Sequence, residues 1–468
     1  MMAPTRVVVE PGFTAPVSVQ VLVIGAGACG LTAALRLADQ GIECVVAERD
    51  ERPAGSTSLS SGFIPAAGTQ AQRALGVDDS PQHFAKDIQH KAHGTAAPHL
   101  VQAYTEAIAP ALDFLADRHG LKWEVLDGFL YPGHTRRRMH TLRERTGEAL
   151  IQALTQAQQR CEIPLLTQAR ACELVVDGAQ RVLGVRLQRP DGSLEAVACD
   201  ALLLACNGYG GAPDLLQRFV PEMMAATFAG HPGNDGTAVR WGEALGARLA
   251  DVRAYQGHGS WAVPHAVLIT WALMVEGGVQ INARGQRFHD ESQGYSEAAL
   301  HVVAQPGGQA WNVFDDPVLK LAQGFPDFVQ AQQTGAVRTC ADVNALAALI
   351  GCDPSTLLAT LTAVSPDAPD PFGRRFARKL QAPFHAVRVT GALFHTQGGL
   401  DIDAQCRVLD GAGHPLPNLW AAGGAARGVS GNDVSGYLSG NGLLSAVAGG
   451  HIAAQTAAEL LQLSGETR

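Results

Sequence analysis

Three glycines and one acidic residue near the start of the chain have the spacing of a dinucleotide site. Gly25, Gly27 and Gly30 follow the pattern G-x-G-x-x-G, and Glu48 comes about 20 residues later. In such a site the first glycine allows a tight turn, the second lets the backbone approach a pyrophosphate, and the third lets a helix pack on a strand. The acidic residue binds a ribose hydroxyl. The alternative is a glycine-rich turn that binds no nucleotide.

The segments around these residues fit the dinucleotide interpretation. Residues 21–24 are branched and apolar, as in a buried parallel strand, and apolar residues then recur at helical spacing over 31–40. Gly41 stands where a helix C-cap belongs, and a second apolar strand at 44–47 ends in Glu48. Strand, glycines, helix, strand and acid together predict that the chain binds a dinucleotide.

Polar and glycine-rich residues follow other predicted strands. The loop 55–69 is rich in serine, threonine and glycine, and 201–211 is a buried strand that ends in glycines. Ligands of this kind of fold lie at the carboxyl ends of the strands, so we expect both segments to approach the ligand rather than to form a flexible surface. In the turn and helix over 231–249, Asp235 is expected near the helix N-terminus.

The middle of the chain separates into helical and strand-like regions. Residues 80–118 are helical in pattern, with Pro98 and Pro110 as helix breakers. Residues 146–159 predict an amphipathic helix, and 163–206 alternate as short strands. Regularity then falls after Tyr255, and nucleotide-domain character returns near residue 379. The expected fold class is therefore α/β, with a Rossmann-like domain at 1–256 and 379–468 and an inserted α+β domain at 257–378.

Composition narrows the function classes. The 468 residues carry a net charge of −9, which argues against nucleic-acid binding. No apolar run approaches the roughly 20 residues of a membrane span, and the first residues lack the apolar core of a signal peptide. The nine cysteines have no metal-ligand spacing, so we expect small buried hydrophobes in a reducing compartment and no metal. The expected location is cytoplasmic.

The order of several segments resembles the fumarate reductase/succinate dehydrogenase flavoprotein superfamily, including its ketosteroid dehydrogenase branch. The resemblance covers nearly the whole chain and includes VLVIGAGACGLTAALRLADQG, HPGNDGTAVRWGEALGA, GGVQINARGQRFHDES, HTQGGLDID and SGNGLLSAVAGGHIAA. It implies FAD in the nucleotide domain, with the inserted domain as a cap that closes over the flavin and a substrate between the two. Some relatives attach FAD through a histidine in the loop after the first acid. Residues 55–62 contain no histidine, so we expect non-covalent FAD.

The fingerprint, its neighbouring loops and the resemblance together give the expected cofactor positions. These are Gly25, Ala26, Gly27, Ala28, Gly30, Glu48, Arg49, Ser56, Thr57, Ser60, Gly62, Ala171, Cys172, Asn207, Gly208, Asp235, Gly423, Gly424, Asn441, Leu443 and Leu444.

The expected catalytic positions depart from the fumarate reductase pattern. Those enzymes use two histidines and two arginines around the substrate carboxylates. His258 and His395 fall where the histidines belong, but Leu319 and Tyr437 stand at the arginine positions. Without the two guanidinium groups the bidentate recognition of a dicarboxylate is lost. Fumarate or succinate chemistry of the standard kind is therefore not expected.

The ketosteroid dehydrogenase branch uses tyrosines instead. By that resemblance, Tyr437 and a backbone N–H of Gly440 or Gly442 bind the substrate ketone, Tyr295 removes a proton, and Tyr131 is a looser third match. The alternative for each tyrosine is a packing role. An unperturbed tyrosine titrates near 10, so a basic Tyr295 needs a partner that the sequence does not identify.

The histidines and a run of arginines also have alternatives. His258 is expected to contact substrate and His395 to contact flavin or substrate, unless His258 is structural. Arg136, Arg137 and Arg138 are expected on a solvated face, the alternative being that one of them anchors a substrate carboxylate at the cleft mouth.

The expected function is an FAD-dependent dehydrogenase that introduces an α,β double bond next to a carbonyl. The substrate is a cyclic or steroid-like ketone, a tyrosine takes the α proton, and the β hydride goes to flavin N5. Hydrogen bonds to the carbonyl oxygen stabilise the developing enolate. The electron acceptor is not identified. The alternatives are an enone or enoate reductase that runs the reverse reaction, and a flavoprotein without turnover that acts as a binding or assembly subunit.

Overall fold

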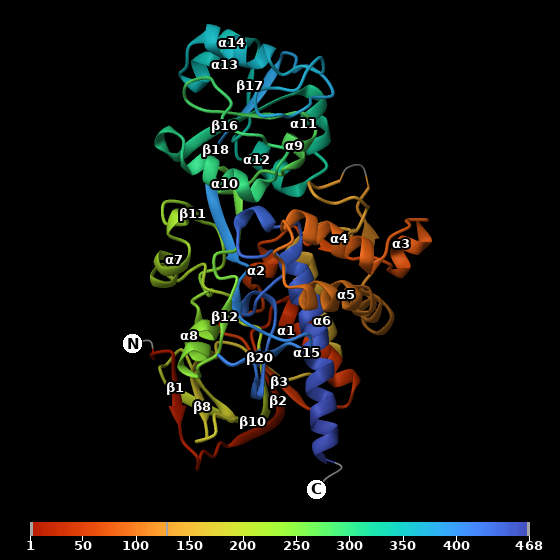
Figure 1. The fold of residues 1–468 in the computed structure, drawn as a ribbon, viewed down its shortest axis with the longest axis vertical. Helices are drawn as coiled ribbons and strands as arrows, with labels where there is room; N and C mark the ends of the chain where they lie inside the picture. The colour runs from red at the N-terminus through yellow and green to blue at the C-terminus, as the bar shows by residue number, and fades with distance from the viewer. Residues whose placement is uncertain (1–2, 128–129, 466–468) are drawn as a thin grey trace. The chain divides into compact units, whose positions relative to one another are not determined.

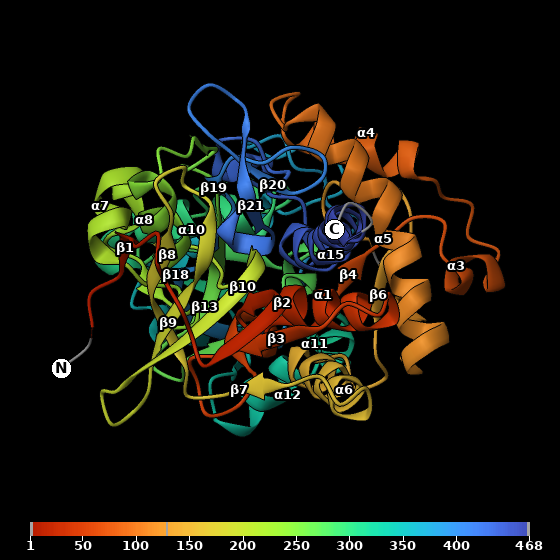
Figure 2. The same ribbon diagram turned by 90° about the horizontal axis from the view of Figure 1, so that it is seen from below.

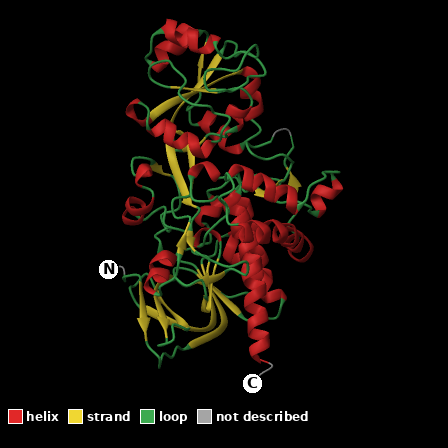
Figure 3. Cartoon of the chain, in the orientation of Figure 1, coloured by secondary structure: helices red, strands yellow, loops and turns green. Residues whose placement is uncertain are grey.

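The computed structural model describes residues 3–127 and 130–465. The chain forms two compact units. The first comprises Met1–Val220, Gly230–Tyr255 and His395–Arg468, and the second comprises Pro221–Ala229 and Gln256–Phe394. Both contain helices and strands (Figure 3), so the predicted α/β class is confirmed. The second unit runs further than the inserted domain expected at 257–378, because the long strand β18 (Phe384–Thr396) pairs with β16 (Gln309–Asp315). The assignment of cofactor and capping roles to these units stays a prediction.

The first unit is built on a nine-stranded sheet. Its strand order is β1-β8-β9-β10-β2-β3-β7, with β21 paired to β10 and β20 paired to β21. The central pairs β10–β2 and β2–β3 are parallel, and Val21 lies opposite Cys44. Figure 2 shows β2, β3 and β10 side by side. The bounds are β1 (Arg6–Val9), β2 (Val17–Ile24), β3 (Cys44–Ala47), β7 (Leu165–Leu166), β8 (Arg170–Val176), β9 (Val182–Gln188), β10 (Leu194–Leu204), β20 (Arg407–Leu409) and β21 (Pro415–Ala421).

The glycine fingerprint joins β2 to helix α1 (Ala28–Asp39) as predicted. Gly25 has a φ of +107°, a conformation that L side chains rarely adopt. A Cβ on Gly30 would lie 1.9 Å from the carbonyl oxygen of Gly25, so only glycine lets the first turn of the helix close on the strand end. Helix α1 packs against α15 (Asn441–Gly465), which also runs beside α5 (Pro98–His119) (Figure 1).

The helical region over 80–118 differs from the prediction at one point. It forms α4 (Pro81–Lys91) and α5 (Pro98–His119), and Pro98 begins α5 as expected for a proline in the first helical turn. Pro110 does not break the helix but lies inside α5. Pro110 and Glu106 are both exposed, so the carbonyl that Pro110 leaves without its helical N–H is open to water.

The other elements of the first unit are mostly short. They are α2 (Gly55–Ser58), β4 (Ile64–Pro65), α3 (Gln70–Ala74), β5 (Glu124–Val125), β6 (Met139–Thr141), α6 (Gly147–Arg160), α7 (Pro213–Phe219), α8 (Thr237–Ala244), β12 (Leu249–Ala250), β19 (Gly399–Leu400) and the 3-10 turns η3 (Gly423–Ala425) and η4 (Val434–Gly436).

The second unit has a seven-stranded sheet in the order β14-β13-β18-β16-β15, with β11 and β17 also paired to β18. Taken one at a time, no described helix is long and apolar enough to cross a membrane. Helices α13 (Val343–Ile350) and α14 (Pro354–Thr362) meet that criterion only together, with a bend of 117°. The bounds are β11 (Thr227–Phe228), β13 (Tyr255–Ala262), β14 (Val267–Leu268), α9 (Ala272–Val275), β15 (Val279–Ile281), α10 (Tyr295–Val303), α11 (Asp316–Ala322), α12 (Pro326–Gln333), β17 (Arg338–Cys340), α13 (Val343–Ile350) and α14 (Pro354–Thr362), with 3-10 turns η1 (Pro221–Met223) and η2 (Pro306–Gly308).

The contact at Gly30 predicts the effect of the smallest possible substitution there. Gly30→Ala places a methyl group inside the Gly25 carbonyl contact, so we expect a loss of about 2–4 kcal/mol of unfolding free energy and a loss of the bound dinucleotide. Gly178→Ala is the matched control, because nothing lies within 4 Å of a Cβ at Gly178. Urea unfolding and the cofactor content of the purified protein measure both effects. Equal cofactor content in the two variants would contradict the prediction.

Candidate functional site

The fingerprint loop of the first unit is tied to the acid predicted to bind ribose. Glu48 Oε2 accepts a hydrogen bond from the backbone N–H of Ala26 at 2.8 Å, and Oε1 accepts one from Asp50 at 3.0 Å. Burial raises the pKa of Glu48, and these two N–H groups oppose that shift. The carboxylate therefore holds the glycine turn against the end of β3, while its remaining lone pairs can still accept a hydroxyl.

The serine-rich loop meets the fingerprint at the start of α1. Thr57 Oγ1 accepts from the backbone N–H of Ala28 at 2.9 Å. Gly27 is the N-cap of α1 and gives it no side-chain cap, and a Cβ there would meet only Thr57 Oγ1, at 3.4 Å. Ser56 Oγ accepts from the side-chain amide of Asn207 at 2.8 Å. A helix N-terminus whose N-cap residue has no side chain, beside hydroxyl groups, is suited to a phosphate.

Other predicted cofactor positions of the first unit also come together. Arg49 pairs with Asp235 at 3.0 Å, and the Asp235 carboxylate accepts from the backbone N–H of Thr237 in the first turn of α8. A Cβ on Gly424 would lie 2.0 Å from Asn207 Oδ1, and one on Gly208 would lie 2.0 Å from Thr396 Oγ1. The remaining positions lie on elements of the same unit: Ser60 and Gly62 after α2, Ala171 and Cys172 in β8, Gly423 in η3, and Asn441, Leu443 and Leu444 in α15.

The end of β18 and the residue that follows η4 bring two predicted catalytic side chains together. The rings of His395 and Tyr437 meet edge to face with centroids 6.1 Å apart. Burial lowers the pKa of His395 to about 4, so its imidazole is neutral near pH 7. A Cβ on Gly442 would lie 2.7 Å from His395 Cε1, and Gly440 has a φ of +87°. Both positions therefore require glycine to bring the backbone this close.

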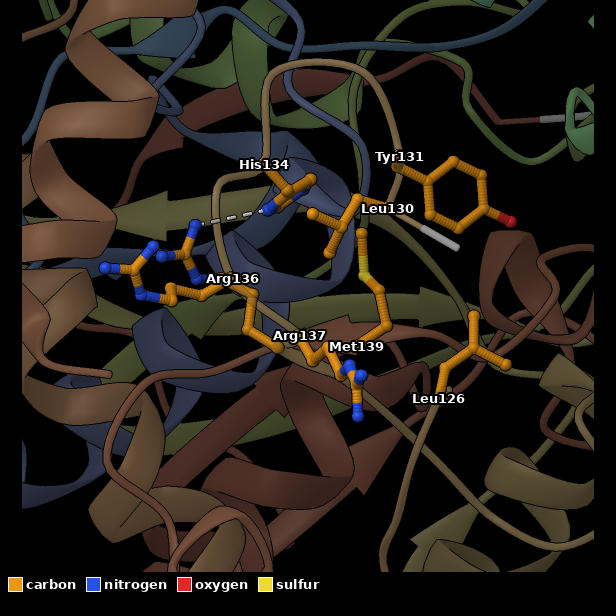
Figure 4. A pocket seen from close by; sticks show the side chains of 8 residues that line it. Leu126, Leu130, Tyr131, His134, Arg136, Arg137 and Met139 are labelled. Carbon is orange, nitrogen blue, oxygen red and sulfur yellow. Dashed lines mark hydrogen bonds between the residues drawn. The ribbon is translucent and has the colours of Figure 1, made fainter. Parts of the chain in front are cut away.

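The predicted Tyr131 lies in a small pocket of the first unit, lined also by Leu126, Leu130 and Met139. Its ring centroid is 6.3 Å from that of Phe63. Figure 4 shows the Tyr131 ring and the Arg136 guanidinium on opposite sides of this pocket. The structure thus packs Tyr131 against the loop that precedes β4.

The run of arginines is only partly solvated. Arg136 and Arg137 are exposed as expected, but Arg138 is buried, which corrects the expectation of a solvated face. Arg138 donates two hydrogen bonds to Asp79, at 2.9 and 3.0 Å, and pairs with Asp87. Two buried carboxylates compensate the charge of the buried guanidinium. The sequence contains three consecutive arginines and does not indicate which of them is buried.

A histidine links this buried arginine to the loop that carries Tyr437. His134 Nε2 donates to the carbonyl oxygen of Ser439 at 2.9 Å, and Arg138 Nη1 lies 3.4 Å from His134 Nδ1, the dashed line in Figure 4. Burial and the Arg138 charge lower the pKa of His134 to about 4. His134 and Arg138 therefore hold the Ser439–Gly440 turn, a role that the sequence did not suggest.

The second unit holds the other two predicted catalytic residues. His258 and Tyr295 stack with centroids 4.7 Å apart and an interplanar angle of 20°, and Trp271 contacts both edge to face. His258 Nδ1 accepts from the backbone N–H of Ser260 at 3.1 Å, so its ring proton is on Nε2. Burial lowers the pKa of His258 to about 3, so this histidine is not the cationic partner that Tyr295 needs.

A buried charge cluster supports that aromatic group. Glu291 pairs with Arg287 at 2.5 Å and Arg374 at 2.8 Å, and Arg287 also pairs with Asp370. These arginines hold the pKa of Glu291 down, at about 2, against its burial. The Glu291 carbonyl oxygen accepts from Trp271 Nε1 at 3.2 Å. The cluster thus positions Trp271, and its cations are already neutralised by carboxylates.

The expectations about a metal site and about the cysteines concern side chains that the structure describes. Within the ranges 3–127 and 130–465, no three His, Cys, Asp or Glu side chains are arranged to hold a metal ion. All nine cysteines are free, but Cys161 is exposed rather than buried. It caps the C-terminus of α6 at the surface, which corrects the expectation that every cysteine is a small buried hydrophobe.

Comparison with known proteins identifies the family. The sequence matches the FAD binding domain family over residues 20–443, which is most of the chain. The chain belongs to this family. The flavoprotein is 27% identical to NADH:fumarate oxidoreductase from Klebsiella pneumoniae (strain 342) over 453 residues, which cover 95% of this chain and 48% of that protein. The chain thus spans about half the length of that relative.

Two solved structures share the fold of the flavoprotein. The open conformation of a flavocytochrome c3 fumarate reductase aligns with a TM-score of 0.80 at 26% identity, over 95% of this chain and 79% of that one. The 3-ketosteroid-Δ4-(5α)-dehydrogenase from Rhodococcus jostii RHA1, in complex with 4-androstene-3,17-dione, aligns with a TM-score of 0.77 at 24% identity, over 98% of this chain and all of that one. The predicted resemblance is confirmed. The flavoprotein is an FAD-dependent oxidoreductase of the class that acts on CH–CH bonds.

The residues of the first unit fit FAD. The bare backbone at Gly27 leaves room for a pyrophosphate, and Glu48 stands where a ribose hydroxyl is expected. Asn441 Oδ1 and Ser445 Oγ, in the first turns of α15, are buried without a hydrogen-bond partner among the described residues. Buried polar atoms are normally paired, so these two indicate a polar ligand group at this helix start. The sequence pointed to Asn441 but not to Ser445.

The buried Arg138 makes a stability prediction with an internal control. Arg138→Met leaves the carboxylates of Asp79 and Asp87 buried without a cation, so we expect a loss of about 3–5 kcal/mol of unfolding free energy. Arg136→Met removes an exposed charge of the same run and is expected to change stability by less than about 0.5 kcal/mol. Urea unfolding of the two variants checks this. Equal midpoints would show that the Arg138 ion pairs do not stabilise the fold.

The buried histidines predict acid sensitivity. Burial lowers the pKa of His134 and His395 to about 4, against about 6.5 in an unfolded chain. Between pH 6.5 and 4 the unfolded state therefore binds protons that the folded state does not, and stability falls as pH falls. The expected slope is about 1.4 kcal/mol per pH unit for each such histidine.

Urea midpoints measured from pH 7 to pH 5 test this expectation. His134→Gln removes one such group and is expected to reduce the slope by about one proton. Midpoints that do not change over this pH range would refute the assignment of neutral buried imidazoles.

Proposed function

We propose that the flavoprotein is a dehydrogenase that introduces an α,β double bond next to the carbonyl of a cyclic or steroid-like ketone, with FAD bound non-covalently. The observation that carries this proposal is that the four side chains expected around the substrate carry no charge near pH 7. His258 and His395 have pKa values lowered by burial to about 3 and about 4, and Leu319 and Tyr437 replace the two arginines that the resemblance places around a dicarboxylate. A neutral set of donors suits a ketone and gives a dicarboxylate no counter-charge.

Each residue has a distinct role in the proposed reaction. Tyr437, with a backbone N–H of Gly440 or Gly442, donates hydrogen bonds to the substrate carbonyl oxygen and stabilises the enolate that develops there. Tyr295 takes the α proton as a phenolate. Tyr295 begins α10, where the positive end of the helix dipole favours negative charge on its oxygen. The bound cofactor supplies the acceptor for the two electrons and the hydrogen that leave the β carbon as the C=C bond forms.

A second candidate is the reverse reaction, reduction of an enone or enoate. The Klebsiella relative is an NADH:fumarate oxidoreductase and the flavocytochrome c3 is a fumarate reductase, and similarity to these two proteins favours this direction. The same donors would polarise the carbonyl of an unsaturated substrate, and Tyr295 would return the α proton. The physiological electron donor or acceptor decides the direction, and the side chains described above fit either one.

Anaerobic stopped-flow spectroscopy of the purified flavoprotein tests the proposal. The oxidised protein is mixed with cyclohexanone-type ketones and 3-ketosteroids, with succinate as a control, and the dithionite-reduced protein is mixed with the matching enones and fumarate. Bleaching of the flavin band by a saturated ketone supports the dehydrogenase. If only the reduced protein reacts, and only with an unsaturated acid, the proposal is wrong.

Tyrosine variants test the roles in the same assay. We expect Tyr295→Phe to lower the bleaching rate by about 10²–10⁴-fold, because the base is lost, and Tyr437→Phe by about 10²–10³-fold, because an oxyanion donor is lost. Tyr104→Phe is the matched control, since Tyr104 is a buried tyrosine of α5 that has no role in the proposed reaction. Rates within about threefold of wild type for both catalytic variants would remove the tyrosine mechanism.

A further inference from the structure

A line of buried polar side chains leads from the start of α15 to His395, entirely within the first unit. Asn441 Nδ2 donates to Ser430 Oγ at 3.0 Å. Ser430 Oγ donates to Gln397 Oε1 at 3.0 Å, and Gln397 Nε2 donates to His395 Nδ1 at 3.1 Å. Asn441, Ser430 and Gln397 are all buried, so solvent does not compete for these bonds.

The direction of this line determines where His395 carries its ring proton. A hydrogen bond donated by Gln397 makes Nδ1 an acceptor, so the single proton of the neutral ring is on Nε2. If both amides were turned over, Ser430 would donate to Asn441 and Gln397 would accept from Nδ1. The ring proton would then be on Nδ1. The two directions therefore predict opposite tautomers.

The buried end of the line favours the first direction. Within the described part of the chain Asn441 Oδ1 has no hydrogen-bond partner, whereas its Nδ2 is bonded. Turning the line over would leave the Asn441 amide N–H groups without that bond, and buried unpaired N–H groups are rarer than carbonyl oxygens that lack a partner. The Thr396 carbonyl oxygen can only accept, so its contact with His395 Nδ1 favours the other tautomer, but at 3.3 Å it is longer than the 3.1 Å contact from Gln397 Nε2.

We propose that Gln397 is a positioning residue that, together with Ser430, fixes His395 as the tautomer with its proton on Nε2, so that His395 donates a hydrogen bond to the carbonyl oxygen of the substrate. This inference rests on the proposed function. Gly442 lies beside this nitrogen, since a Cβ there would be 2.9 Å from His395 Nε2. Together with Tyr437, the site then offers two neutral donors and selects a substrate group that only accepts, which a ketone or enone oxygen does.

The tautomer is measured on the resting flavoprotein by ¹⁵N NMR of the histidine rings. Comparison with His395→Asn assigns the His395 signals. We expect Nδ1 to be unprotonated and Nε2 protonated at pH 7. A protonated Nδ1 in the wild-type protein overturns the proposal, and this holds whatever substrate the enzyme uses. The proposed function can thus fail in the ketone assay while the tautomer assignment stands.

Two substitutions of Gln397 give readouts that a purely structural role would not. Gln397→Glu places a carboxylate at Nδ1, so the proton moves to Nδ1 and the pKa of His395 rises by about one to three units from about 4. We expect the pH profile of kcat to gain an inflection from this ionisation. Gln397→Leu removes the donor, and we expect kcat to fall about 10–100-fold with KM changed less than about threefold.

Control variants distinguish loss of this line of hydrogen bonds from general misfolding. Gln405→Leu, at an exposed position, is expected to change neither tautomer nor rate. Ser430→Ala breaks the line one bond further away and is expected to give a mixture of tautomers even if Gln397→Leu does not fold. If Gln397→Leu folds and keeps both the wild-type tautomer and the wild-type kcat, Gln397 does not position His395.

Discussion

The close approach of the Gly25 carbonyl to Gly30 is the contact on which the first unit depends. It seats α1 on the end of β2, and α1 in turn packs against α15. Helix α15 begins at Asn441, beside the loop that carries Tyr437. A single backbone contact at one end of the fingerprint therefore aligns two helix starts, one suited to a phosphate and one to a polar group of the cofactor and substrate.

Buried charges in both units are used to hold backbone rather than to face a ligand. Arg138 is neutralised by two carboxylates and acts through His134 on the Ser439 carbonyl. In the second unit Glu291 is neutralised by two arginines and acts on Trp271. The side chains proposed to contact the substrate are not part of these clusters, and burial keeps His258 and His395 neutral. The buried ion pairs thus hold loops in place. Because burying charges is costly, their main effect is to fix the position of these loops rather than to stabilise the fold.

The sequence predicted the parts of this fold that depend on local pattern. The strand, glycine turn and helix around Gly25 follow from steric needs that only a few residue types meet, so a single sequence reveals them. Pro110 was expected to break a helix, yet its exposed face and tertiary packing allow α5 to continue. Arg138, Ser430 and Gln397 were not singled out for their buried contacts, because a buried polar contact depends on partners from distant segments. The pattern of neighbouring residues carries no record of those partners.

The proposed preference for a neutral carbonyl follows from what burial does to histidine. An imidazole taken out of water loses its proton unless a carboxylate faces it, and the contacts described for His258 and His395 are a backbone N–H, a carbonyl oxygen, an amide and aromatic rings. A neutral imidazole still has one N–H to donate. A hydrogen bond donated to one ring nitrogen places that proton on the other nitrogen. The Ser260 N–H makes that choice at His258, and the Gln397 amide is proposed to make it at His395. Both choices leave the N–H on Nε2, so each neutral imidazole keeps one donor suited to an uncharged oxygen rather than a cation suited to a carboxylate.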